Sequence, residues 1–257
     1  MTGRALILDC DGVLADTELD GHLVAFNQTF AELGLPIAWT ADEYGDLLRI
    51  GGGKERLRAY LGAHPELDLG DDDTVSDLVA QAHQRKSAIY VDLVESGALP
   101  ARPGIARLVH EALNAGWAVA IASTSALASV QAVANAVLDA ADLGRLSGIF
   151  AGDVVAAKKP APDIYHLAVQ TLAVDPELVI VVEDSQSGAA AAAAAGLRHL
   201  VTLSHFTHDD AFPQAATVVE HVGVAGLPTR TVAGADVVHE GLVTVDSLEA
   251  LLRTPRP

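Results

Sequence analysis

Two aspartates near the start of the chain, Asp9 and Asp11, stand where they could carry out chemistry. They follow the apolar run Ala5–Leu8, which has the length and composition of a strand buried on both faces of a parallel sheet. Ligands of open α/β sheets bind beyond the carboxyl ends of the strands. Because the two aspartates are two residues apart on an extended strand end, both carboxylates point to the same side. One carboxylate of such a pair can stay ionised as nucleophile or metal ligand, while its neighbour is pushed toward protonation and serves as acid and base.

Three further polar clusters follow downstream, each at the end of a predicted strand or in a loop. The hydroxyl residues 123–125 end the apolar run 118–122, and they could donate hydrogen bonds to phosphate oxygens or cap the next helix. Lys159 precedes Pro160 in a segment whose prolines fix the direction of the backbone. Glu183 and Asp184 end the strand-like run 178–182, where a buried acidic pair is costly unless it binds a cation or is hydrogen-bonded.

The elements that position these clusters indicate an α/β protein with an inserted helical segment. Helical periodicity covers residues 22–33, 41–48, 55–61 and 74–95, and no strand-like run interrupts it. A crossover between parallel strands needs only about a dozen residues, so we expect residues 16–99 to form a separate helical cap. Residues 1–15 and 100–257 would then form the catalytic core, and the prolines and glycine of residues 99–104 mark the return to it.

The rest of the chain alternates helical and strand-like segments, as a parallel sheet requires. The alanine-rich residues 189–195 lie between two glycines and predict a structural helix packed tightly on the sheet. Further strands are expected at 148–152, 199–203 and 217–221, and further helices at 105–114, 127–139 and about 245–252.

Composition limits the classes of function. The chain has 257 residues, half of them apolar, and a formal net charge of −18, which argues against nonspecific binding to nucleic acid or to an anionic membrane surface. The single cysteine, Cys10, cannot form an internal disulfide. The first predicted strand begins close to Met1 and no apolar run reaches about eighteen residues, so we expect a cytoplasmic protein. We also expect a monomer that acts on a small molecule.

The four clusters together resemble the motifs of the haloacid dehalogenase-like phosphohydrolases, in the same order along the chain. The resemblance implies a Rossmann-like parallel sheet with an inserted α-helical cap and a site at the carboxyl ends of the strands. It implies that Asp9 is the nucleophile that forms an aspartyl-phosphate, and that Asp11 protonates the leaving oxygen and then activates water. It further implies the following roles: Ser123 and Lys159 hold the phosphoryl group, and Mg²⁺ is bound by Asp9, Asp184 and the main-chain carbonyl of Asp11, with Glu183 assisting.

The helical segment narrows the resemblance to the CbbY-type branch, on residues 20–22, 26–30 and 44–56. Members of that branch include phosphatases that remove xylulose 1,5-bisphosphate, so the implied substrate is a sugar bisphosphate. The glycines 51–53 expose backbone N–H groups at a helix N-terminus beside Lys54 and could bind a second anion, although a flexible loop would have the same composition. The implied substrate-binding residues are Glu18, His22, Tyr44, Gly52, Gly53, Lys54, Arg56, Thr124 and Ser125.

Two alternatives remain open at this point. A β-phosphoglucomutase-type phosphosugar mutase has the same four motifs and usually carries a histidine twelve residues after the nucleophile, where this chain has Gly21 followed by His22. A non-catalytic sugar-phosphate sensor could share the fold, but here every catalytic position is filled.

Overall fold

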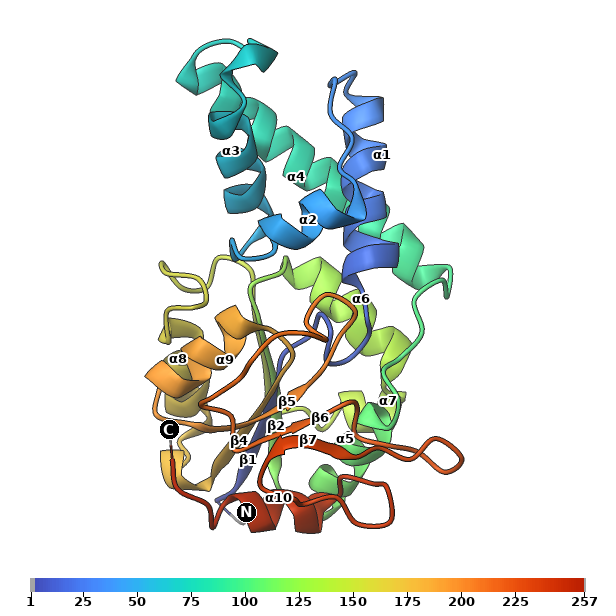
Figure 1. The fold of residues 1–257 in the computed structure, drawn as a ribbon, viewed down its shortest axis with the longest axis vertical. Coiled ribbons are helices and arrows are strands. Elements are labelled where there is room, and N and C mark those ends of the chain that lie inside the picture. The colour runs from blue at the N-terminus through green and yellow to red at the C-terminus, as the bar shows by residue number, and fades with distance from the viewer. Residues whose placement is uncertain (1–2, 257) are drawn as a thin grey trace.

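A seven-stranded sheet in the order β3-β2-β1-β4-β5-β6-β7 forms the core of the computed structural model, which describes residues 3–256 (Figure 1). Neighbouring strands are parallel except β7, which runs antiparallel to β6. The expected parallel α/β sheet is therefore confirmed. The strand β7 was not expected, because its residues are largely exposed and give no buried apolar run. The strands are β1 Ala5–Leu8, β2 Ala118–Ser123, β3 Gly148–Ala151, β4 Val179–Glu183, β5 Arg198–Thr202, β6 Thr217–Val219 and β7 Thr231–Gly234.

Helices cover both faces of the sheet. Because side chains alternate along a strand, Leu6 and Leu8 of β1 pack in one apolar cluster and Ala5 and Ile7 in another. The first cluster includes residues of α5 (Ile105–Asn114), α6 (Leu127–Val137) and α10 (Val245–Leu251). The second includes residues of α8 (Asp163–Leu172) and the alanine-rich α9 (Gln186–Ala194). Two short elements, α7 (Ala140–Leu143) and the 3₁₀ turn η3 (Pro176–Leu178), complete this part of the chain.

Helix α8 was missing from the sequence-based expectation. Pro160 and Pro162 indicated extended backbone, but Pro162 lies at the N-cap position, where a proline does not interrupt the helix. Ile164, Tyr165 and Ala168 face the core from it, and their spacing of three to four was the signal for a helix.

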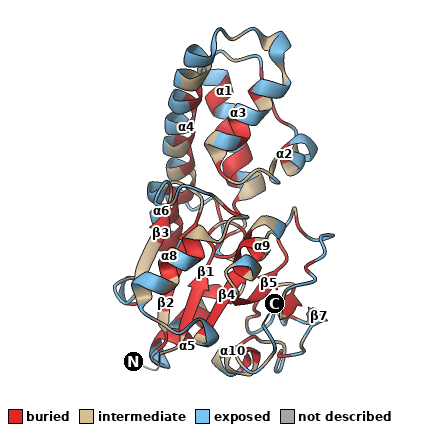
Figure 2. Ribbon diagram, turned by 90° about the vertical axis from the view of Figure 1, so that its left-hand side faces the viewer, coloured by how far each residue is buried: buried red, intermediate tan, exposed pale blue. Residues whose placement is uncertain are grey.

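The segment between β1 and α5 is helical and stands beyond the carboxyl end of the sheet (Figure 1). It has its own apolar cluster, centred on Phe26, Phe30 and Trp39, and Figure 2 shows the buried faces of α1, α3 and α4 turned toward one another. Helix α4 runs from this cluster down to α6 (Figure 2). The helices are η1 Glu18–Leu23, α1 Val24–Glu32, α2 Ala41–Leu47, α3 Gly53–Ala63, η2 Pro65–Leu67 and α4 Asp72–Glu95.

The two connections between this helical segment and the sheet lie side by side. Ala15 forms an isolated bridge with Ala101, and the Arg102 N–H donates to the Leu14 carbonyl at 2.8 Å. The guanidinium of Arg102 lies 3.7 Å from the Asp16 carboxylate. We propose that these connections separate the cap, residues 16–99, from the core, because a pair of adjacent crossings lets the cap move as a unit.

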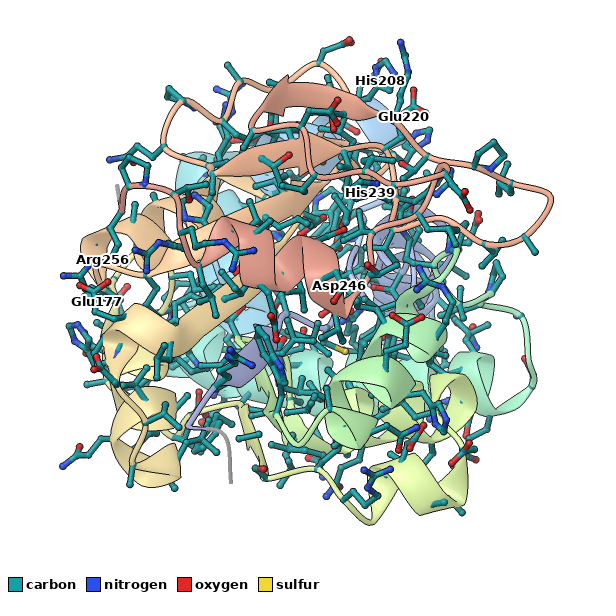
Figure 3. The ribbon with its side chains drawn as sticks, turned by 90° about the horizontal axis from the view of Figure 1, so that it is seen from below. Glu177, His208, Glu220, His239, Asp246 and Arg256 are labelled. Atoms are coloured by element: carbon teal, nitrogen blue, oxygen red, sulfur yellow. The ribbon has the colours of Figure 1, made fainter. Side chains whose placement is uncertain are left out.

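The opposite end of the molecule is closed by the C-terminal segment. Figure 3 shows this end with α10, which begins near Asp246, across its middle. Arg256 lies beside Glu177 in the same view, and their ion pair measures 2.9 Å. Within residues 3–256, none of the helices has the length and apolar composition needed to cross a membrane.

Candidate active site

An acidic cluster and one lysine meet at the carboxyl ends of β1 and β4. Leu8 of β1 is in register with Val182 of β4, so Asp9 and Glu183 follow side by side. Lys159 Nζ lies 2.8 Å from Asp9 Oδ1 and 2.6 Å from Glu183 Oε1. Asp184 completes a set of three buried carboxylates whose oxygens lie within 4.8 Å of one another.

The turn after β1 is shaped by the same cluster. Gly12 has a φ of 77°, and a Cβ at this position would overlap the carboxylate of Asp184. A glycine is needed here both for its backbone conformation and for the space it leaves. Gly12 therefore allows Asp184 to approach the two aspartates of the first motif.

The acidic cluster fits a hard divalent cation. Burial raises the pKa of Asp9 to about 7, although the charge of Lys159 opposes this. Burial, with the charges of Asp9 and Glu183, also raises the pKa of Asp184 well above its usual value. Three buried carboxylates therefore face a single buried ammonium, and a set of oxygen donors with excess negative charge is typical of a Mg²⁺ site.

Asp11 has a different environment, with hydrogen-bond donors on several sides. The hydroxyls of Thr17 and Ser125 each donate to its carboxylate at 2.5 Å, and His22 Nε2 lies 2.9 Å away. Although burial opposes ionisation, the contact with His22 and the two hydroxyl donors hold the pKa of Asp11 well below its usual range. The two carboxylates thus have opposite surroundings: burial and acidic neighbours raise the pKa of Asp9, whereas the donors around Asp11 favour its ionised form. The division of roles between them stays a prediction.

His22 reaches Asp11 because the helix around it is a π-helix. The N–H groups of Gly21 and His22 both donate to the Thr17 carbonyl, at 3.1 and 2.8 Å. A π-turn accommodates one more residue than an α-turn, which compensates for the one-residue offset noted in the sequence. On the other side of the ring, Lys86 Nζ lies 2.6 Å from Nδ1. Because an ammonium can only donate, this contact assigns the proton to Nε2, which donates to Asp11.

Lys86 was not identified from the sequence. It lies on the buried face of α4, in line with Val79, Ala82 and Ile89, and only 6% of its surface is exposed. Burial lowers its pKa to about 8, while the charges of Glu18 and Asp11 act in the opposite direction. A lysine at an apolar helical position was the available signal, since a buried charge needs a partner.

The cap contributes a second group of polar side chains around Arg56. The guanidinium of Arg56 donates a hydrogen bond to the Tyr44 hydroxyl oxygen at 2.7 Å and lies 4.0 Å from the Glu18 carboxylate. Tyr44 in turn donates a hydrogen bond to Glu18. Arg56 and Glu18 face the cavity, whereas Tyr44 lies behind them and fixes their positions.

The loop after β2 presents its hydroxyls to the same space. The N–H of Ser125 donates to Ser123 Oγ at 3.1 Å, which leaves the Ser123 hydroxyl proton available to another acceptor. The N-cap of α6 is Ala126, with no side-chain cap, so residues 123–125 do not serve to cap that helix. The Ser125 hydroxyl donates to Asp11, so the Ser123 hydroxyl is the group that can donate to an anion here.

One cavity between cap and core brings most of the predicted site residues together. Of the predicted set, Tyr44, Lys54 and Glu183 are not among the lining residues: Tyr44 and Glu183 lie directly behind the cavity wall, and Lys54 forms an ion pair with Asp153. The lining residues that the sequence analysis did not indicate are Lys86, Ser185, Ser187, Ser204, Phe206 and Thr207. The lining consists of Asp9, Asp11, Glu18, His22, Leu48, Gly51, Gly52, Gly53, Arg56, Lys86, Ser123, Thr124, Ser125, Lys159, Asp184, Ser185, Ser187, Ser204, Phe206 and Thr207.

Similarity to known proteins extends over most of the chain and includes the residues of the candidate site. The family model described as haloacid dehalogenase-like hydrolase matches residues 4–196. A CBBY-like protein of Arabidopsis thaliana is 47% identical over 221 residues, which are 85% of this chain and 69% of the relative. Protein CbbY of Cupriavidus necator is 42% identical over 221 residues, 86% of each chain. The crystal structure of a CbbY variant from Rhodobacter sphaeroides in complex with xylulose-(1,5)bisphosphate is 38% identical, with a TM-score of 0.76 over 87% of this chain and 98% of that one.

Proposed function

Since the chain belongs to the haloacid dehalogenase-like hydrolases and is a phosphatase similar to CbbY, we propose that it removes one phosphate from a sugar bisphosphate such as xylulose 1,5-bisphosphate. The observation that carries this proposal is the distribution of cations around the cavity. The core supplies Lys159 beside Asp9, and the cap supplies Arg56 and Lys86. Because the protein has a net charge of −18, it can bind one anionic group on each side of the cavity only where local cations outweigh the repulsion by this negative charge.

In the proposed first step, Asp9 attacks the phosphorus and the bond between phosphorus and the sugar oxygen breaks. Asp11 gives a proton to that oxygen, and the phosphoryl group stays on Asp9 as an aspartyl-phosphate. In the second step Asp11 takes a proton from water, which attacks the phosphorus and releases phosphate from Asp9. The hydrogen bonds from Thr17, Ser125 and His22 favour the ionised state of Asp11, which suits this second step, whereas the first requires the protonated form.

The side chains around Asp9 supply positioning and charge. Lys159 offers a fixed positive charge to the transferring group, and the free donor of Ser123 hydrogen-bonds one of its oxygens. Asp9, Asp184 and the Asp11 main-chain carbonyl, with Glu183 behind them, would hold Mg²⁺. When bound, this ion supplies further positive charge against the phosphoryl oxygens.

The test is a phosphate-release screen over sugar mono- and bisphosphates in Mg²⁺, repeated with EDTA. We expect release that depends on the metal and is greatest with a bisphosphate. Metal-independent release, or release from monophosphates alone, would refute the proposal.

A phosphosugar mutase is the second candidate, and the contact of His22 with Asp11 favours it because a histidine at this place is a mutase feature. Analysis of the sugar products in the same screen separates the two activities. A mutase would give an isomeric sugar phosphate with little free phosphate. A phosphatase would give free phosphate and the sugar with one phosphate fewer in equal amounts.

A further inference from the structure

A charged contact joins the cap to the core outside the cavity. Lys54, in the first turn of α3, lies 2.5 Å from Asp153 Oδ2, and Asp153 belongs to the loop after β3. The other oxygen of this carboxylate, Oδ1, lies 2.9 Å from Lys158 Nζ. One core carboxylate is therefore shared by a cap lysine and a core lysine.

A second contact lies beside this one and reaches the catalytic centre. A Cβ on Gly51 of the cap would lie 2.5 Å from the main-chain carbonyl oxygen of Lys159, so the two backbones touch. Lys159 is the residue whose ammonium contacts Asp9. The cap residues 51–54 thus rest on the core loop 152–159, and this loop carries both Asp153 and Lys159.

We propose that Asp153 is a positioning residue that holds the cap over the core through Lys54, and that Lys54 does not bind the substrate. This inference rests on the proposed phosphatase function. Closure places the cap cations and the core site around one substrate, so any contact formed only in the closed arrangement favours productive binding. Lys54 and Asp153 are far apart in sequence and belong to different parts of the fold, which is what such a contact requires.

The local charges explain why the carboxylate matters. Without Asp153, the ammonium groups of Lys54 and Lys158 would be left near each other with no anion between them, and their repulsion would favour opening. Hydrogen bonds from the two lysines lower the pKa of Asp153 to about 2, so the contact persists across the range in which the enzyme is assayed. The side chains of Lys54 and Asp153 are 38% and 64% exposed, and an ion pair this open shifts an equilibrium by about two- to fivefold.

The experiment compares Asp153→Asn, Lys54→Gln and the double variant, measuring kcat and KM on xylulose 1,5-bisphosphate at low and high salt. We expect each single variant to raise KM about two- to fivefold with a smaller change in kcat, and the double variant to be no worse than Lys54→Gln. High salt should remove most of the difference, because it screens exposed charges. Lys54→Arg should retain wild-type KM. The control is Glu66→Gln, which breaks a comparable exposed pair, with His64, inside the cap.

Three results would overturn the inference: additive losses in the double variant, wild-type kinetics in both single variants, or a loss from Lys54→Gln with none from Asp153→Asn. The last would identify Lys54 as a substrate contact. If wild-type enzyme does not cleave the bisphosphate, the proposed function fails on its own. The same comparison then proceeds on whichever phosphate ester the wild-type enzyme cleaves best, and non-additivity there still decides the role of Asp153.

Discussion

Replacement of Lys86 by methionine tests the connection from the cap to Asp11. Methionine fills the same space on the buried face of α4 with an apolar side chain of similar length. The variant therefore removes the donor to His22 Nδ1 and one cation of the cavity with little change in packing. A hydrogen bond to a charged group contributes about 1.5 to 3 kcal/mol. If that contribution is realised in the transition state, kcat/KM for the bisphosphate should fall roughly ten- to 150-fold.

The pH profile gives the same prediction a second readout. Because burial lowers the pKa of Lys86 to about 8, the side chain is charged below that pH and loses its charge as the pH rises through it. Wild-type kcat/KM should therefore decline above about pH 8, and this alkaline decline should be missing from Lys86→Met.

Arg85→Met is the matched control. Arg85 is the preceding residue of the same helix, but its guanidinium is exposed and pairs with Glu32 at 2.5 Å, away from the cavity. This variant should stay within about twofold of wild type. Wild-type activity of Lys86→Met, together with a wild-type alkaline decline, would show that Lys86 does not act through His22 and Asp11.

Three further predictions concern the core site. Asp9→Asn should abolish turnover. Asp11→Asn should lower kcat by about 10²- to 10⁴-fold but keep the wild-type affinity for Mg²⁺, measured by calorimetry. Loss of metal binding in Asp11→Asn would show that the Asp11 side chain is a ligand. Mg²⁺ should raise the melting temperature more at pH 8 than at pH 6. Burial raises the pKa of Asp9 to about 7, so a proton on Asp9 stabilises the metal-free folded state at low pH, and this stabilisation is lost as the pH rises through 7. If Mg²⁺ raised the melting temperature by an equal or smaller amount at pH 8, this would count against the carboxylate site. Gly12→Ala should be destabilised, with impaired Mg²⁺ binding, because a Cβ overlaps Asp184 and the φ of 77° is strained for alanine; wild-type melting and metal affinity would contradict this.

The sequence was sufficient for features that depend on neighbouring residues in the chain. Apolar runs ending in Asp9, Ser123 and Glu183 predicted strands whose carboxyl ends carry polar groups. The structure places Asp9 and Ser123 in the lining of one cavity and Glu183 directly behind its wall. The helical segment after β1 was predicted from periodicity alone. These properties follow from local pattern and from the rule that parallel strands meet at one edge.

Other features depend on contacts between distant elements, which the local sequence pattern does not specify. Lys86 joins the site only because α4 passes beside η1, and the order of ionisation of Asp9 and Asp11 depends on which donors surround each carboxylate. The direction of Lys54 depends on Asp153, which is 99 residues away. Periodicity predicts which face of a helix is buried, but it does not predict which element packs against that face.

Phosphate release from xylulose 1,5-bisphosphate and from the matching monophosphate, measured side by side as kcat/KM with Mg²⁺, tests the proposed activity. We expect a clear preference for the bisphosphate, because Arg56 and Lys86 line the cap side of the cavity and would bind the second phosphate. We also expect no release by Asp9→Asn. Equal values for the two substrates, or phosphate release by Asp9→Asn, would contradict the proposed function.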